Sequence, residues 1–86
     1  MPTRVLVADD SFLIREGIRQ LLSLTDRVEL VGVCADEAET LAAVAADPPD
    51  VVLSDVRMPP TCTDEGVRIA RRLRVTHPQV GVVLLS

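Results

Sequence analysis

The sequence predicts an α/β domain in which a parallel β-sheet lies between two layers of helices. Short, almost continuously apolar segments alternate along the chain with longer segments whose apolar residues recur at helical spacing. The linking segments are long enough to hold the crossover helix that parallel strands require. Because such crossovers are right-handed, every strand-to-helix turn is expected at the carboxyl edge of the sheet, where ligands bind in folds of this class.

Size and charge narrow the class of protein further. The chain has 86 residues, 48% of them apolar, and a net charge of −4, which indicates one small domain over residues 1–86. The acidic balance disfavours non-specific binding to nucleic acid or to an anionic membrane. With no signal peptide and no apolar stretch of membrane-spanning length, a cytoplasmic location is expected. Cys34 and Cys62 lack metal-ligand spacing and are expected to be free thiols.

The first half of the chain contains two predicted strands and a helix between them. Residues 4–8 form an apolar run, as expected for a strand covered on both faces, and the run stops at an acidic pair. Residues 11–24 have an amphipathic helical pattern, with Asp10 or Ser11 as the N-cap. Residues 28–34 are rich in β-branched side chains and predict the second strand.

The second half repeats this alternation. A helix is expected from the N-cap candidate Asp36 to about Ala46, before two consecutive prolines that a helix does not accommodate. Residues 51–54 predict a buried third strand, residues 64–75 a third helix, and residues 79–86 a fourth apolar strand.

Three carboxylates follow predicted strands at the edge where ligands bind. Asp9 and Asp10 come directly after the first strand, and Asp55 comes directly after the third. Taken singly, each is more often an N-cap or a turn former than a ligand. If the two strands are neighbours, however, like charges would converge on one small site, which favours a bound hard cation such as Mg²⁺.

Several sequence stretches carry a family resemblance. They are V-L-V-A-D-D at residues 5–10, R-E-G at 15–17, L-L at 21–22 and P-D-V-V-L-S-D-V-R-M-P at 49–59. With them the chain resembles, over its whole length, the receiver domain of bacterial two-component response regulators, and most of all the regulators with a LuxR-type DNA-binding domain. The resemblance implies a flavodoxin-like receiver fold with strand order 2-1-3-4, in which the fifth strand and the last helices of the family are absent.

The resemblance also implies a role for each site residue. Asp55 corresponds to the phosphoacceptor, which takes a phosphoryl group from the phosphohistidine of a sensor histidine kinase. Asp9 and Asp10 correspond to the acidic pair that binds Mg²⁺ together with Asp55, and Arg57 to the position whose backbone carbonyl completes the metal site. Ser86 corresponds to the switch hydroxyl that hydrogen-bonds the phosphoryl group. Transcription would be controlled through an effector domain outside this chain, which would also supply any DNA contact.

Two departures from the family pattern qualify these expectations. The chain contains no Lys, whereas the family places a phosphoryl-binding Lys at the end of its fifth strand. The sequence also reads as a receiver that stops after its fourth strand, which would leave residues 80–85 as an exposed apolar edge. We therefore expect self-association through that edge or by exchange of an element.

Other functions remain open at this point. The main alternative is a pseudo-receiver that is not phosphorylated and acts only in protein interaction or dimerisation. A phosphohydrolase with an Asp nucleophile is disfavoured because Arg57 stands where such enzymes carry a second acid, and no glycine-rich nucleotide loop follows the first strand. The chain is thus expected to be a signalling domain and not an enzyme. Four arginines lie between residues 68 and 74. They favour a solvated helix face over the alternative of a docking patch.

Overall fold

The computed structural model describes residues 2–58 and 63–85. Strands and helices alternate in the order β1 (Thr3–Ala8), α1 (Phe12–Leu22), β2 (Val28–Cys34), α2 (Glu37–Ala46), β3 (Val51–Asp55), α3 (Glu65–Thr76) and β4 (Gly81–Leu85). All four strands are parallel and form one sheet in the order β2-β1-β3-β4. This confirms the predicted α/β class and the strand order that the family resemblance implies. Cys62 and Ser86 lie outside the described residues.

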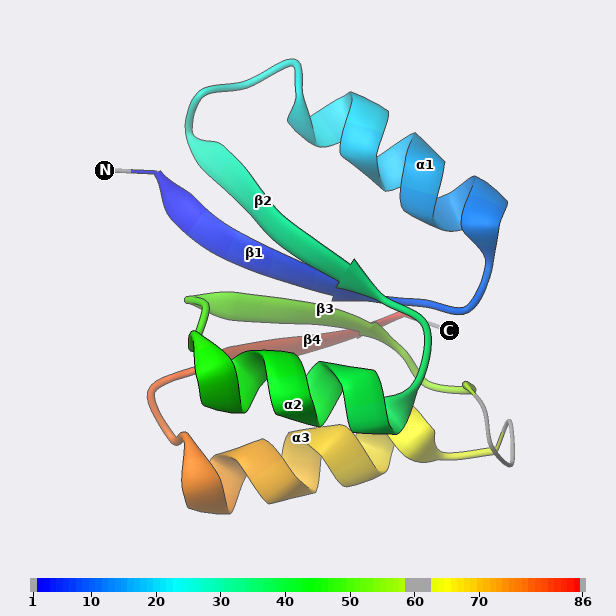
Figure 1. The fold of residues 1–86 in the computed structure, drawn as a ribbon, viewed down its shortest axis with the longest axis vertical. Helices are drawn as coiled ribbons and strands as arrows, with labels where there is room; N and C mark the ends of the chain where they lie inside the picture. Colours follow the sequence, from blue (N-terminus) through cyan, green and yellow to red (C-terminus); the bar gives the residue numbers. More distant parts are fainter. Residues whose placement is uncertain (1, 59–62, 86) are drawn as a thin grey trace.

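The helices divide unequally between the two faces of the sheet. α1 lies on one face, and α2 and α3 lie side by side on the other (Figure 1). The larger core lies under α2 and α3, where nine side chains form one buried cluster: Leu6, Ala8, Cys34, Val44, Val52, Met58, Ile69, Leu73 and Val80. In contrast, α1 contains no buried residue. Burial raises the pKa of the Cys34 thiol, which is free as predicted.

Three of the predicted element boundaries shift. The first helix ends at Leu22, because the N–H groups of Ser23 and Leu24 close a final turn on carbonyls of the preceding helix. The fourth strand begins at Gly81 instead of residue 79, because the Val80 N–H donates to the His77 carbonyl in a turn. The third strand is one residue longer than predicted and includes Asp55, which pairs with Leu85.

The capping hydrogen bonds show which of Asp10 and Ser11 is the N-cap of α1. The Ser11 hydroxyl accepts the Ile14 N–H at 3.3 Å, so Ser11, and not Asp10, is the N-cap of α1. Asp36 caps α2 as predicted, by accepting the Glu39 N–H at 2.8 Å. The carboxylate of Asp10 is therefore not used to cap α1.

β4 forms one edge of the sheet and is largely exposed. Val83, Leu84 and Leu85 keep 47%, 40% and 40% of their surface in solvent. The expectation of a strand covered on both faces holds for β1, and the exposed apolar edge predicted for the fourth strand is present at β4. Over the described residues, no helix has both the length and the apolar character needed to cross a membrane.

Candidate functional site

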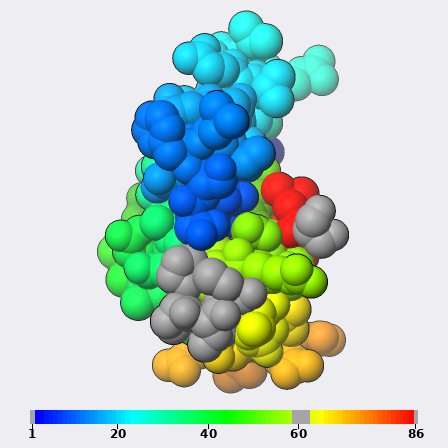
Figure 2. Space-filling view, turned by 90° about the vertical axis from the view of Figure 1, so that its right-hand side faces the viewer, coloured from blue at the N-terminus to red at the C-terminus, as the bar shows by residue number. Residues whose placement is uncertain are grey.

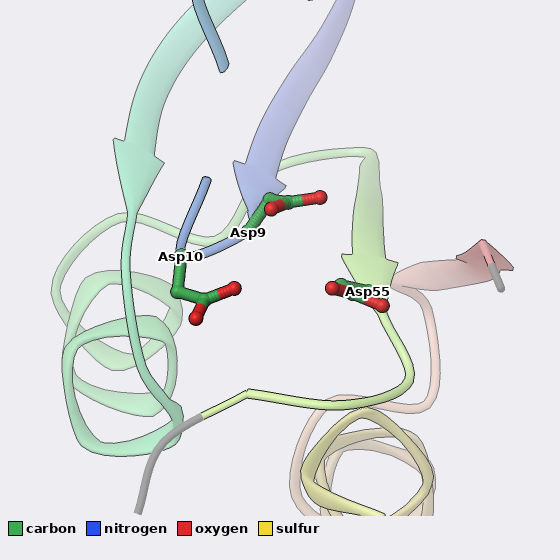
Figure 3. Close-up of side chains that lie close together, drawn as sticks. All are labelled: Asp9, Asp10 and Asp55. Atoms are coloured by element: carbon green, nitrogen blue, oxygen red, sulfur yellow. The ribbon is translucent and has the colours of Figure 1, made fainter. Parts of the chain in front are cut away.

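The carboxyl edge of the sheet brings three carboxylates together. Asp9, Asp10 and Asp55 each offer one carboxylate oxygen, and these oxygens lie within 4.8 Å of one another. In Figure 3 the side chains of Asp10 and Asp55 face each other across the gap between the ends of β1 and β3. Figure 2 looks onto this edge, where the blue start of α1 adjoins the yellow-green residues that follow β3. The predicted convergence is confirmed.

Asp9 is the buried member of the cluster, with 7% of its surface exposed. Its backbone N–H donates to the Cys34 carbonyl at 2.9 Å, and its Oδ1 accepts the Ser11 N–H at 2.8 Å. Desolvation by burial raises the pKa of the Asp9 carboxyl, and the nearby charges of Asp55 and Asp10 raise that pKa further. The Ser11 hydrogen bond and the Arg15 guanidinium act in the opposite direction.

Asp55 is positioned by both β3 and β4. As the last residue of β3 it pairs with Leu85, and the next residue, Val56, donates its N–H to the Leu85 carbonyl at 3.1 Å. Its Oδ1 accepts the Arg57 N–H at 3.2 Å, so the loop that follows orients the carboxylate. Asp55 is half-buried and Asp10 is exposed, so the cluster is open to solvent on one side.

The other two predicted site residues are Arg57 and Ser86. Arg57 is exposed and contacts Asp55 through its backbone N–H, while the role expected of its carbonyl stays a prediction. Ser86 lies outside the described residues, so its role also stays a prediction. The nearest described position to Ser86 is Leu85, which is beside Asp55 in the sheet.

Two residues near the cluster were not predicted to take part. Arg15, one turn after the Ser11 cap, lies close enough to Asp9 to offset part of its negative charge, and its Nε is buried with no hydrogen-bond partner among the described residues. Gly66 is buried directly beneath the backbone of Asp55. The only sequence signal for Arg15 was its helical spacing from the acidic pair, and for Gly66 its place at the start of a helix.

The donor set fits one kind of ion. It consists of carboxylate oxygens, which hard divalent cations such as Mg²⁺ prefer, and no His or Cys contributes to this cluster. Because one side of the cluster is exposed, a small cation there could keep several of its waters, as Mg²⁺ usually does. The acidic cluster lies at the carboxyl end of a doubly wound parallel sheet, which is where α/β domains of this class bind their ligands.

Comparison with known proteins places the chain within that class. The family model for the response regulator receiver domain matches residues 5–86, and the chain belongs to this family. It is 40% identical to the transcriptional regulatory protein NarL of Mycobacterium tuberculosis over 83 residues. It is 39% identical to the response regulator GacA of Pseudomonas viridiflava and 35% identical to a protein-glutamate methylesterase/protein-glutamine glutaminase of Trichodesmium erythraeum.

Solved structures agree on the fold. The signal receiver domain of NarL from M. tuberculosis superposes with a TM-score of 0.86, covering 96% of this chain and 64% of that one. The isolated receiver domain of RcsB from Salmonella enterica gives 0.87 at 21% identity, which supports the fold alone. The chain covers 96% of its own length in the alignments to NarL, GacA and the methylesterase, but only 37%, 37% and 23% of theirs. The shared region is the receiver, which is a signalling domain.

Proposed function

We propose that this chain is the phosphoacceptor module of a bacterial two-component response regulator, with Asp55 as the phosphorylated residue. The observation that carries the proposal is the meeting of Asp9, Asp10 and Asp55 at the end of β1 and β3, in a chain of the receiver family. The donor is a phosphohistidine of a sensor histidine kinase. Transcription is then controlled through an effector domain, as the 40% identity to the transcriptional regulatory protein NarL suggests.

The reaction is a phosphoryl transfer between two nucleophiles. A carboxylate oxygen of Asp55 attacks phosphorus in line with the phosphorus–nitrogen bond of the donor. The new oxygen–phosphorus bond makes an acyl phosphate, the phosphorus–nitrogen bond breaks, and the imidazole leaves with its electron pair and takes up a proton. The Arg57 N–H, at 3.2 Å from Oδ1, holds the carboxylate in one orientation for this attack.

The acidic neighbours have a separate role. Asp9 and Asp10, with Asp55 and the Arg57 carbonyl, would hold Mg²⁺, for which the oxygen-only donor set is suited. When bound, Mg²⁺ neutralises charge on the transferring phosphoryl oxygens. Ser86 would supply a hydroxyl donor to the same group. No residue of this sequence is a Lys, so these roles are assigned to carboxylates, a hydroxyl and backbone groups.

The alternative of a non-phosphorylated pseudo-receiver is not favoured. All three acidic positions keep carboxylates, and their oxygens converge instead of pointing into solvent separately. A receiver that had lost phosphorylation would not need to retain three like charges in one pocket, because their repulsion destabilises the fold. The module acts as a substrate of its kinase in the cytoplasm and not as an enzyme on a separate substrate.

Phosphoryl uptake tests the proposal. The 86-residue chain is incubated with Mg²⁺ and a small phosphoramidate donor, and its intact mass is measured. We expect wild type and Asp26→Asn, an exposed Asp far from the site, to gain the mass of one phosphoryl group, and Asp55→Asn to gain none. Chelation of Mg²⁺ with EDTA should suppress the gain. Equal uptake by wild type and Asp55→Asn, or uptake by neither wild type nor Asp26→Asn, would refute the proposal.

A second proposal concerns self-association. We infer that two copies associate through β4, because among the described residues β4 has a strand neighbour on one side only, and its three exposed apolar side chains are adjacent in sequence. Pairing of two identical edges satisfies the geometry of a twofold dimer. Exchange of an element between copies is the other way to cover the same surface.

A further inference from the structure

The first turn of α3 lies directly against the backbone that carries Asp55. The Gly66 N–H donates to the Val56 carbonyl at 2.9 Å, and Gly66 is buried. A Cβ at Gly66 would overlap the Asp55 carbonyl oxygen and would lie 2.8 Å from the Val56 Cα. The atoms in the way belong to the backbone and not to a flexible side chain, so any other residue at this position must displace the Asp55 segment.

A buried carboxylate anchors the same turn. Glu65 has no exposed surface, although Glu is rarely buried without partners. Its Oε1 accepts the Thr63 N–H at 3.0 Å, which joins the end of the preceding loop to the start of α3. Its Oε2 lies 3.7 Å from Nη2 of Arg68, one helical turn further on. The position of this turn therefore depends on a charge interaction as well as on packing.

Arg68 connects the turn to the neighbouring helix. Its Nη2 and Nε donate to the two carboxylate oxygens of Glu37 at 2.8 and 3.2 Å, and Glu37 is the first residue of α2. The planar guanidinium makes this two-bond geometry possible, which an ammonium would not reproduce. One side chain thus contacts the first residue of α2 and the first residue of α3.

We propose that Gly66 and Arg68 are positioning residues for the phosphoacceptor. Gly66 lets α3 approach the Asp55 carbonyl, and Arg68 holds that turn in place through Glu65 and Glu37. Contacts from Glu37 through Arg68 and Glu65 to the first turn of α3 thus link the helices α2 and α3 to the backbone of Asp55. This inference rests on the proposed function of Asp55, and it extends that function to residues that touch neither the cation nor the phosphoryl group.

Substitution at the glycine tests the close approach. Gly66→Ala is compared with Gly17→Ala, where an added Cβ has no atom within 4 Å. The backbone amide resonances of Asp55 and Val56 are recorded by NMR during a MgCl₂ titration. We expect Gly66→Ala to shift both resonances before Mg²⁺ is added and to weaken Mg²⁺ binding by about tenfold or more, as displaced supports of metal ligands do. Gly17→Ala should bind Mg²⁺ as wild type does.

Substitution at the arginine tests the connection without a buried clash, and it keeps the proposal testable if Gly66→Ala does not fold. Arg68→Gln is compared with Arg72→Gln, on the same helix, whose side chain forms no ion pair with the residues at 2–58 and 63–85. We expect Arg68→Gln to weaken Mg²⁺ binding by about twofold to fivefold, the range of one exposed ion pair, with unchanged helix content. Arg68→Lys, which keeps the charge but loses the fork, should fall between wild type and Arg68→Gln.

The outcomes separate this proposal from the one on which it rests. If wild type binds no Mg²⁺ and takes up no phosphoryl group, the proposed function itself fails. If wild type does both, but Arg68→Gln matches Arg72→Gln in Mg²⁺ affinity and in the Asp55 and Val56 resonances, the positioning role is refuted. A lower melting temperature of Arg68→Gln with unchanged Mg²⁺ affinity also refutes it, since that is the result of a purely structural role.

Discussion

At the scale of single residues, the site is held in an electrostatically unfavourable state by the fold. Asp9 is 7% exposed and lies beside two further carboxylates, and the Ser11 N–H and the Arg15 charge offset part of this penalty. Burial and like charge together favour the neutral form of Asp9. The free energy of folding should therefore change when one of these carboxylates is protonated or neutralised by substitution, or when a cation binds them.

The first prediction concerns the substitution Asp9→Asn. The pKa of Asp9 is raised in the folded chain above its ordinary value of 3.8. Between the ordinary pKa and the folded pKa, the folded state therefore holds this proton more often than the unfolded state does. Stability contributed by this group is therefore lost as pH increases through the folded pKa. At pH 7 in EDTA, Asp9→Asn should be more stable to urea than wild type, because an amide oxygen still accepts the Ser11 N–H without adding charge. Added Mg²⁺ should stabilise wild type but not the variant.

The control is Asp26→Asn, which removes an equal charge from an exposed position. It should leave the urea midpoint almost unchanged, within the small range of ordinary surface substitutions. Were Asp9→Asn less stable than wild type without Mg²⁺, the carboxylate would be stabilising the fold, contrary to the electrostatics described above.

At the scale of elements, the sequence predicted most of the architecture because strand and helix patterns are local. The apolar runs identified every described strand, and the residues before α1 and α2 identified their caps, apart from the choice between Asp10 and Ser11. The convergence of Asp9, Asp10 and Asp55 followed from strand adjacency. Family resemblance, and not periodicity, supplied the strand order.

Features that depend on contacts between distant segments were not predictable. Nothing in the composition of α3 indicates that Gly66 touches the Asp55 backbone, because this contact requires the final packing of α3 against β3. The burial of Glu65 is likewise unusual for a glutamate, and its contacts with the Thr63 N–H and with Arg68 arise only in the folded chain. The exposure of β4 was predicted from the strand count, but the complete lack of buried residues in α1 was not.

The second prediction, at this scale, concerns the start of α2. Asp36 accepts the Glu39 N–H at 2.8 Å, and the Glu39 carboxylate in turn accepts the Ala35 N–H at 2.8 Å. Asp36→Ala should therefore lower the free energy of unfolding by about 1 kcal/mol. Asp64→Ala is the matched control, because Asp64 occupies the N-cap of α3 without a side-chain cap hydrogen bond. Urea denaturation of the two variants should separate them, and equal losses would contradict the capping assignment.

At the scale of the whole molecule, the uneven distribution of helices leaves apolar surface uncovered. Two helices cover one face of the sheet and one helix lies on the other, while β4 exposes both its edge and part of its side chains (Figure 1). A domain of this size has a small hydrophobic core. Burying its exposed apolar surface against a second copy would therefore stabilise it substantially. The exposed β4 and the acidic pocket meet at Leu85, which pairs with Asp55.

The third prediction follows for the oligomeric state. Light scattering should give a mass above the 9.3 kDa monomer, rising with protein concentration. Val83→Lys should shift the population toward monomer, because a charge on an edge strand opposes pairing. Val75→Lys, also exposed but at the end of α3, should leave the mass unchanged. A wild type that is monomeric at every concentration would rule out association through β4, and a dimer that survives Val83→Lys would indicate an exchanged element.

The role of Asp55 as phosphoacceptor is tested most directly by locating the phosphoryl group along the chain. After reaction of wild type with the phosphoramidate donor and Mg²⁺, fragmentation of the intact protein in the mass spectrometer locates the added mass between neighbouring backbone cleavages. We expect a single phosphoryl group on Asp55, between Ser54 and Val56. A phosphoryl group on Asp9 or Asp10, or on any residue outside the pocket, would contradict it.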